Sequence, residues 1–194
     1  MVQASGLRSG MVLQIDSELY KVVSADYHAG GGKMGGATHA KLKNLHTGTF
    51  WERRFRPDEK LQDVELQRVT MQFIYQDGDD YYFMDPNTYE QTALSSSMIG
   101  PAEKFLQPEM RLPVELHDGK PVIVLFPEFI DLKVSMTAQP IHTQQDNTMK
   151  PATLENGMEI LVPQFIKPGE IVRVEIETGK YLERVRHEEE KKRH

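Results

Sequence analysis

Short apolar runs separated by turn residues are the feature that most constrains the fold of this chain. Five polar connections, at residues 16–18, 46–48, 76–80, 117–120 and 177–180, each separate two runs of strand-forming residues. Hairpins repeated in this way predict an all-β protein built from small barrels. A single helix is expected over Ser96–Leu106, where apolar residues recur at roughly helical spacing. The expected strands are Met11–Ile15, Leu19–Ser24, Lys41–Leu45, Thr49–Phe55, Val69–Tyr75, Tyr81–Met84, Arg111–Leu116, Val122–Leu125, Ile171–Ile176 and Tyr181–Val185.

The hairpins fall into three groups separated by polar connectors. A chain of 194 residues with 39% hydrophobic content can bury several small cores. We therefore predict three barrel domains, at residues 1–64, 65–127 and 128–186. Residues 187–194 form a charge run with no apolar face, and we expect this tail to be disordered.

Composition excludes several classes of protein. The chain has no cysteine, which rules out disulfides, thiolate catalysis and zinc–thiolate sites and favours a cytoplasmic location. No apolar run is long enough to span a membrane, and the first residues lack the pattern of a secretory signal. The net charge of −6 argues against binding nucleic acid through bulk charge, although local basic patches can still do so.

A glycine-rich stretch over residues 28–37 surrounds a single lysine, Lys33. Such a run cannot form a stable helix interior or a packed strand, so it predicts an exposed loop tip that presents one amine. The glycines also satisfy G-x-G-x-x-G, but a strand-like segment follows where a dinucleotide-binding loop needs a helix. The alternative is an ordinary hairpin tip with a surface lysine. The residues that present Lys33 are Gly31, Gly32, Met34 and Gly35.

Basic and aromatic residues alternate on the two strands expected after this loop. Lys41 and Lys43 share one face of the first strand, and Trp51, Arg53 and Phe55 share one face of the second. Small β-barrels use basic side chains to contact phosphate and aromatic rings to stack on bases, which favours RNA binding. The alternative is that the aromatic residues supply the barrel core and that the basic side chains are simply solvated.

Signals for catalysis or metal binding are lacking in the sequence. None of the seven histidines lies three or four residues from another, so no short-range metal pair is expected. A nucleophile elbow is absent, and the carboxylates are too dispersed to single out an acid–base pair. We expect no enzyme activity, no metal and no cofactor.

Two separated stretches give the chain a resemblance to a known family. The lysine loop is followed by Lys41–Thr49, which looks like the Lys-Leu-x-x-Leu-x-Thr-Gly-Thr strand pair of bacterial elongation factor P. Lys33 falls at the modified tip position of that family when this strand pair is aligned. The chain resembles the family over almost its full length. Its C-terminal signature is matched by Lys150–Leu154, Gly157, Ile160–Pro163 and Gly169.

The resemblance implies an L-shaped, tRNA-like molecule with an SH3-like (KOW-like) barrel followed by two OB-fold domains. It implies a monomeric translation elongation factor that binds the ribosome between the P and E sites, contacts peptidyl-tRNA and promotes peptide bond formation at consecutive prolines. Lys33 becomes the site of post-translational modification by a separate lysine-modifying enzyme. The resemblance also implies that Tyr181, Arg184 and Arg186 lie near the anticodon arm of the tRNA. The strand pattern adds Lys41, Lys43 and Arg53 as candidate RNA-binding residues.

The chain departs from the family pattern at the tip and in one further loop. Gly31 stands where the family commonly has proline, and Met34 stands where it has the glycine after the lysine. The Gly-Asp-Thr loop that approaches the E-site codon is not visible within His142–Thr148. The competing hypothesis is an RNA-binding β-barrel module without a role in peptide bond formation, in which Lys33 is one of several interchangeable basic residues.

Overall fold

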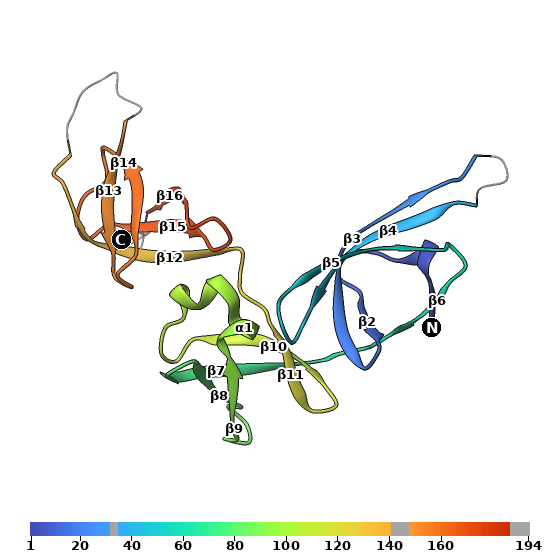
Figure 1. Cartoon of the computed structure of the whole chain (residues 1–194). Helices are drawn as coiled ribbons and strands as arrows, with labels where there is room; N and C mark the ends of the chain where they lie inside the picture. The colour runs from blue at the N-terminus through green and yellow to red at the C-terminus, as the bar shows by residue number, and fades with distance from the viewer. Residues whose placement is uncertain (32–34, 141–147, 187–194) are drawn as a thin grey trace, which may run out of the picture. The chain divides into compact units, whose positions relative to one another are not determined.

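The computed structural model describes residues 1–31, 35–140 and 148–186, and this part of the chain forms three antiparallel sheets (Figure 1). The first sheet has six strands in the order β1-β6-β2-β3-β4-β5. The predicted all-β class with three small β domains is confirmed. The strands of the first sheet are β1 (Val2–Gln3), β2 (Val12–Ile15), β3 (Glu18–His28), β4 (Ala37–Asn44), β5 (Phe50–Phe55) and β6 (Lys60–Asp63).

Alternating buried residues hold the first sheet around one apolar core. The tight turn from β2 to β3 places Asp16 and Ser17 at φ of 50° and 69°, the left-handed pair that suits a two-residue hairpin. A bulge in β3 after Val22 shifts its pairing with β4. The core consists of Ala4, Leu7, Leu13, Val22, Ala40, Leu42, Phe55 and Leu61.

The second sheet has five strands in the order β11-β10-β7-β8-β9. Its β10–β11 hairpin turns through Asp118 and Gly119, which also have positive φ. Phe83 and Val114 are fully buried, and the ring of Phe73 lies 5.4 Å from that of Phe83. The strands are β7 (Gln67–Asp77), β8 (Asp80–Met84), β9 (Gln91–Ser95), β10 (Arg111–His117) and β11 (Lys120–Val124).

The predicted helix over Ser96–Leu106 is wrong as a single element. The structure has a short helix α1 (Ser96–Ile99) followed by a 3-10 helix over Gly100–Phe105. Gly100 has a φ of 70° and is followed by Pro101, which has no N–H to donate. The helical periodicity was real, but these two residues end the α-helical turn at Ile99.

The third sheet has five strands in the order β14-β13-β12-β15-β16. Its core also takes in Phe105 from the 3-10 helix. The described residues fall into two compact units, one within 1–100 and 108–125 and the other within 101–107 and 126–186. The strands are β12 (Phe129–Thr137), β13 (Met149–Leu154), β14 (Glu159–Pro163), β15 (Ile171–Glu175) and β16 (Tyr181–Val185).

The exact domain boundaries at 64/65 and 127/128 stay predictions. The expected disordered tail at 187–194 lies outside the described residues, as does most of His142–Thr148, where we looked for a codon-contacting loop. No helix among the described residues is long and apolar enough to cross a bilayer.

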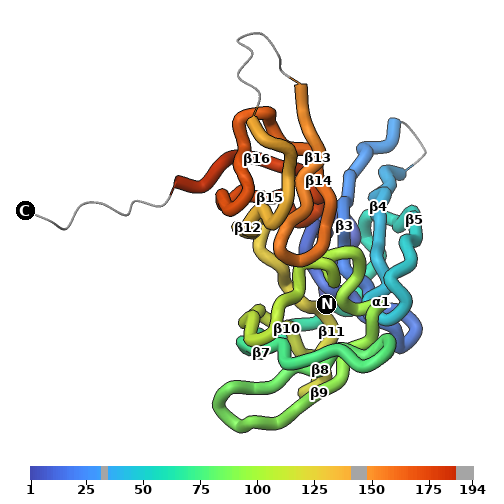
Figure 2. The backbone as a smooth tube through the Cα atoms, turned by 90° about the vertical axis from the view of Figure 1, so that its left-hand side faces the viewer, coloured from blue at the N-terminus to red at the C-terminus, as the bar shows by residue number. Residues whose placement is uncertain are grey.

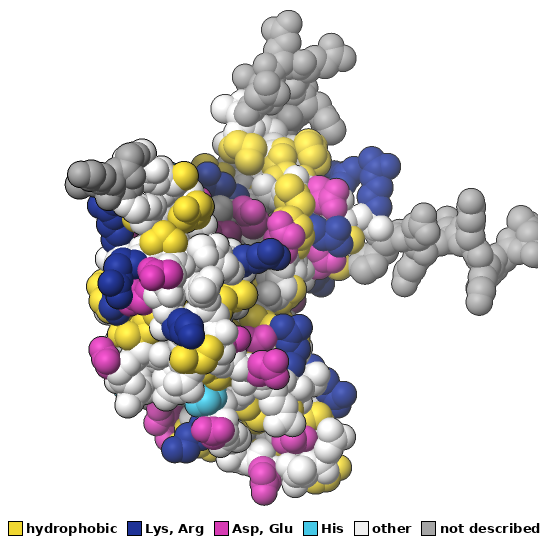
Figure 3. Space-filling view, turned by 90° about the vertical axis from the view of Figure 1, so that its right-hand side faces the viewer, with side chains coloured by type: hydrophobic (Ala, Val, Ile, Leu, Met, Phe, Trp, Pro, Cys, Tyr) yellow, Lys and Arg dark blue, Asp and Glu magenta, His cyan; other side chains and the backbone are white. Residues whose placement is uncertain are grey.

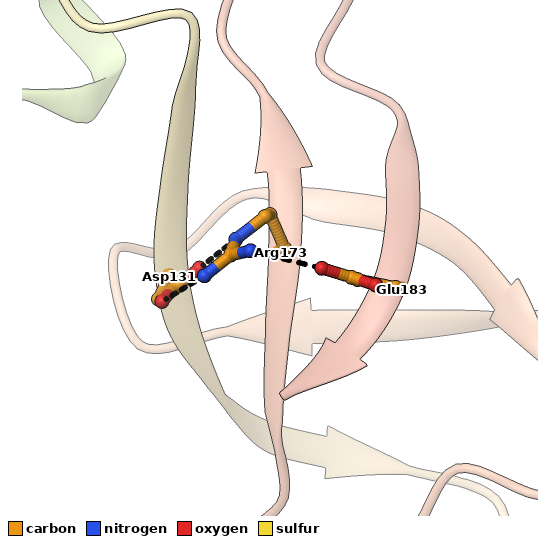
Figure 4. Close-up of polar contacts among 3 residues, drawn as sticks. All are labelled: Asp131, Arg173 and Glu183. Carbon is orange, nitrogen blue, oxygen red and sulfur yellow. Dashed lines mark hydrogen bonds and ion pairs between the residues drawn. The ribbon is translucent and has the colours of Figure 1, made fainter. Parts of the chain in front are cut away.

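Ion pairs join three strands on the outer face of the third sheet. The Arg173 guanidinium of β15 bonds both carboxylate oxygens of Asp131 on β12, at 2.8 and 3.1 Å, and one oxygen of Glu183 on β16 at 2.9 Å (Figure 4). The hydrogen bonds to Asp131 are the main cause of a raised pKa for Arg173. This cross-strand bridging supports the register of β16 against β15 and of β15 against β12.

A buried lysine joins two loop segments of this domain. Lys150 of β13 is 4% exposed, and its ammonium donates to the carbonyl oxygens of Ala138 at 2.5 Å and Ile166 at 2.7 Å. These bonds tie the chain after β12 to the turn after β14. The lysine of the C-terminal signature therefore has a structural role.

We expect Lys150→Met to lower the free energy of unfolding by about 1–3 kcal/mol, because the buried Ile166 carbonyl loses its donor. Urea denaturation followed by circular dichroism measures the change. The matched control is Lys133→Met on β12, an exposed lysine whose replacement should change stability by less than about 0.5 kcal/mol. Equal stabilities of the two variants would contradict the assigned role.

Candidate functional site

The β3–β4 hairpin is the element that carries the lysine loop. The two strands pair from Tyr20 opposite Asn44 to His28 opposite Ala37, and they run side by side in both views (Figures 1 and 2). The sequence predicted the first strand to cover only Leu19–Ser24, whereas the strand-like segment expected after the loop, Ala37–Leu45, agrees with β4. The hairpin is therefore longer than predicted and extends past the rest of the first sheet toward the loop (Figure 1).

The two sides of the loop are described, but its tip is not. The predicted tip residues Gly32, Lys33 and Met34 lie outside the described residues. Gly31 and Gly35 are both exposed, and a Cβ built on either meets no described atom within 4 Å beyond its chain neighbours. The hairpin thus brings the two ends of a three-residue segment with Lys33 at its centre to an open, solvated position.

Basic side chains gather on the outer face of the hairpin and of β5. Lys41 and Lys43 alternate with the buried Ala40 and Leu42, so both point away from the core, as predicted. The register places Arg54 of β5 opposite His39 and places Lys21 of β3 opposite Lys43. The sequence analysis did not single out Lys21, because its partner across the sheet is seen only once the register is known.

This outer face is mixed rather than uniformly basic. The Lys41 ammonium lies 4.9 Å from the centre of the exposed Phe50 ring, and Glu52 lies opposite Lys41 on β5. In the space-filling view, lysine and arginine side chains alternate with hydrophobic and acidic ones (Figure 3). An ammonium beside an exposed ring offers both a phosphate contact and a stacking surface.

Arg53 lies on the other face of β5. It is opposite Ala40, its guanidinium lies 5.0 Å from the Trp51 ring and 4.8 Å from the Phe55 ring, and it pairs with Glu59 at 3.6 Å. The structure thus separates Arg53 from the other predicted basic residues. Its charge is already partnered and its stem is packed against aromatic rings.

The Lys-Leu-x-x-Leu-x-Thr-Gly-Thr stretch owes its residue types to turn geometry. The side-chain oxygen of buried Asn44 accepts hydrogen bonds from the backbone of His46 at 2.8 Å and of Thr47 at 2.9 Å. Gly48 has a φ of 74°, which favours glycine. The turn therefore fixes how β4 joins β5, and with it the alignment of the basic residues on these strands.

Two of the three predicted C-terminal residues are brought together by a bulge. Residues three apart on a regular strand face opposite sides, but the pairing of β15 with β16 shifts between Arg173 and Val174, so Tyr181 and Arg184 both lie over the core side. Burial raises the pKa of the Tyr181 phenol, and the nearby Arg184 charge partly offsets this effect. Arg186 is exposed just after β16.

Arg184 is already engaged within the domain. Its guanidinium bonds Glu170 at 3.2 Å and lies 5.3 Å from the centre of the half-exposed Phe165 ring. Together with Tyr181, it forms a rigid aromatic and cationic cluster on the C-terminal sheet.

Metal chemistry finds no support in the described part of the chain. Within residues 1–31, 35–140 and 148–186, no three histidine or acidic side chains come close enough to hold a metal ion. The His28 and His39 rings lie 5.3 Å apart in an edge-to-face arrangement at the end of the hairpin, which is a packing contact.

Comparison with known proteins agrees with the three sheets. The model of the elongation factor P KOW-like domain matches residues 3–61, that of its OB domain matches residues 66–124, and that of its C-terminal domain matches residues 130–184. Among solved structures, the chain is similar to eukaryotic translation initiation factor 5A from Methanococcus jannaschii. That match has a TM-score of 0.50 and 20% identity, and it covers 64% of this chain and 92% of the other, which shows a likeness of fold.

Full-length relatives extend the similarity to the whole chain. Elongation factor P of Clostridium botulinum (strain Hall) is 40% identical over 186 residues, which is 95% of this chain and 100% of the relative. Elongation factor P of Caldicellulosiruptor saccharolyticus is 38% identical over the same shares. With a KOW-like domain followed by two further β domains, and with a lysine at the centre of its glycine loop, the chain belongs to the elongation factor P family of translation elongation factors.

Proposed function

We propose that this chain binds the cytoplasmic ribosome as a monomer between the P and E sites, contacts peptidyl-tRNA and promotes peptide bond formation at consecutive prolines through Lys33. The observation that carries the proposal is the long β3–β4 hairpin, which holds both ends of the Lys33 loop beyond the barrel core. An amine delivered in this way can approach the acceptor end of a tRNA.

The chemistry expected of Lys33 is electrostatic positioning. Proline is a poor partner in peptide bond formation, and a cation placed near the tRNA end can hold the reacting groups in productive geometry. The factor supplies no acid, base or nucleophile, and the ribosome carries out the reaction. A modifying enzyme that extends Lys33 would lengthen its reach.

The basic outer face of the hairpin supports an approach along an RNA backbone. Lys21, Lys43 and Arg54 share this face with Lys41, and each can contact a phosphate. We assign Tyr181, Arg184 and Arg186 to a second contact, toward the anticodon arm.

Replacing Lys33 by alanine should reduce the rate of Pro-Pro bond formation by roughly 100-fold, the loss typical of removing one preorganised electrostatic group. The measurement is single-turnover peptide synthesis on ribosomes stalled at a Pro-Pro-Pro sequence, with factor purified from its native host. The matched control is Lys133→Ala, which removes an exposed lysine from β12 and should leave the rate unchanged. An undiminished rate with Lys33→Ala would refute the proposed mechanism.

Neutralising basic residues of the outer face should weaken ribosome binding while Lys33 is kept. Affinity for RNA falls as salt rises, and we expect Lys43→Gln and Arg54→Gln each to make the plot of log affinity against log salt shallower by about 1. The loss of one phosphate contact has this effect. Arg53→Gln is the comparison, because Arg53 is paired with Glu59 and packed on the other face.

The salt titration also discriminates the competing hypothesis. If all basic replacements, Lys33→Gln included, weaken binding alike while Pro-Pro synthesis is unaffected, the chain is an RNA-binding module without a role in the reaction.

A further inference from the structure

Gly36 differs from the other described glycines of the lysine loop. A Cβ at Gly36 would lie 2.8 Å from the carbonyl oxygen of His28 and 2.9 Å from the hydroxyl oxygen of Tyr27, closer than real Cβ atoms approach. A Cβ at Gly31 or Gly35 meets no described atom within 4 Å beyond its chain neighbours. Gly36 does not have a positive φ, so glycine is required there by space rather than by backbone conformation.

The space at Gly36 is filled by the backbone carbonyl of His28 and by the side chain of Tyr27, both on the facing strand. Tyr27 is opposite Thr38, so Gly36 is its diagonal neighbour on the same face of the hairpin. The Cε2 atom of the tyrosine ring would lie 3.0 Å from a Cβ at Gly36, so the hydroxyl end of the ring lies against this glycine. An aromatic ring that covers a cross-strand glycine is a known way to pin strand register.

The two strands differ in burial at this end of the hairpin. Tyr27 and His28 of β3 are exposed, with Tyr27 at 54%, whereas Ala37 and Thr38 of β4 are buried. The last strand pair before the loop is His28 with Ala37, and the His28 ring packs on that of His39. The contact between Tyr27 and Gly36 reaches past this last pair, so it is placed to fix the direction in which the chain leaves the hairpin on the side of Gly36.

We propose that Tyr27 is a positioning residue, which packs on Gly36 and thereby aims the Lys33 loop. The proposal rests on the proposed function, since it concerns how well the amine reaches the tRNA end. Misplacement of a reacting group by about 1 Å can cost about 100-fold in rate even when the change is remote from the chemistry.

The first test compares Gly36→Ala with Gly6→Ala, the same change at a glycine outside the loop, where a Cβ makes only an ordinary contact of 3.5 Å with Val2. We expect Gly36→Ala to lower the maximal rate of Pro-Pro synthesis by about tenfold or more and to leave the half-saturating factor concentration within about twofold. Gly6→Ala should match the unaltered chain in both. A lower maximal rate with an unchanged half-saturating concentration indicates that Lys33 is misplaced while ribosome binding is intact.

The second test uses the ring itself. Tyr27→Phe keeps the ring and should retain the maximal rate, whereas Tyr27→Leu should lower it as Gly36→Ala does. The spectroscopic readout is the NMR shift of the Gly36 Hα protons, which the ring current of the adjacent Tyr27 changes. This ring-current shift should persist in Tyr27→Phe and vanish in Tyr27→Leu, while the shifts of the core of the first sheet stay unchanged.

Lys33→Ala in the same assay tells the two proposals apart. If Lys33→Ala has no effect, the proposed function fails. If Lys33→Ala is slow but both Gly36→Ala and Tyr27→Leu keep the full maximal rate, the proposed function stands and the positioning role of Tyr27 is overturned. An unchanged Gly36 Hα shift in Tyr27→Leu would likewise overturn it. Should Gly36→Ala fail to fold, Tyr27→Leu and Tyr27→Phe still decide the question.

Discussion

The pairing of β3 with β4 is the constraint on which the candidate site depends. Its inner half is anchored in the first core by Val22 and Leu42, and its outer half continues to His28 and Ala37 beyond that core. A shift of one residue in this pairing would turn every side chain of the hairpin to the opposite face. The same register thus sets the exposure of the basic side chains, the closure of the loop and the contact of Tyr27 with Gly36.

The register also explains why basic residues that look equivalent in the sequence differ in role. Lys41, Lys43 and Arg54 reach the outer face, whereas Arg53 is directed to the other side and is partnered by Glu59. The bulge in β16 has a similar effect in the C-terminal domain, where it brings Tyr181 and Arg184 to one face. Local pairing, rather than composition, decides which charges can meet an RNA backbone.

Much of this architecture could be predicted from the sequence, because turn residues and alternating apolar residues act locally. The turns at Asp16–Ser17 and Asp118–Gly119 have the positive φ values that such residues favour. The parts of the strands that the sequence did not predict depend on longer-range contacts. β3 was predicted to end at Ser24, since Asp26, Tyr27 and His28 are exposed and have no core to alternate against. β6 is mostly polar and forms because β1 and β2 lie on either side of it. β12, in contrast, alternates buried Leu132 and Val134 with exposed residues and was missed although the signal was present.

The central claim is that the glycine loop delivers Lys33 to the acceptor end of the P-site tRNA. Because the chain has no cysteine, a single thiol can be placed beside the lysine by Gly35→Cys, a position with open space around its Cβ. An iron chelate tethered there generates hydroxyl radicals that cut nearby RNA on the ribosome. The account predicts cleavage at the 3′ end of the P-site tRNA, and none there from a chelate on Asn87→Cys at the exposed turn after β8. Cleavage of the acceptor end from neither position, or from both alike, would contradict it.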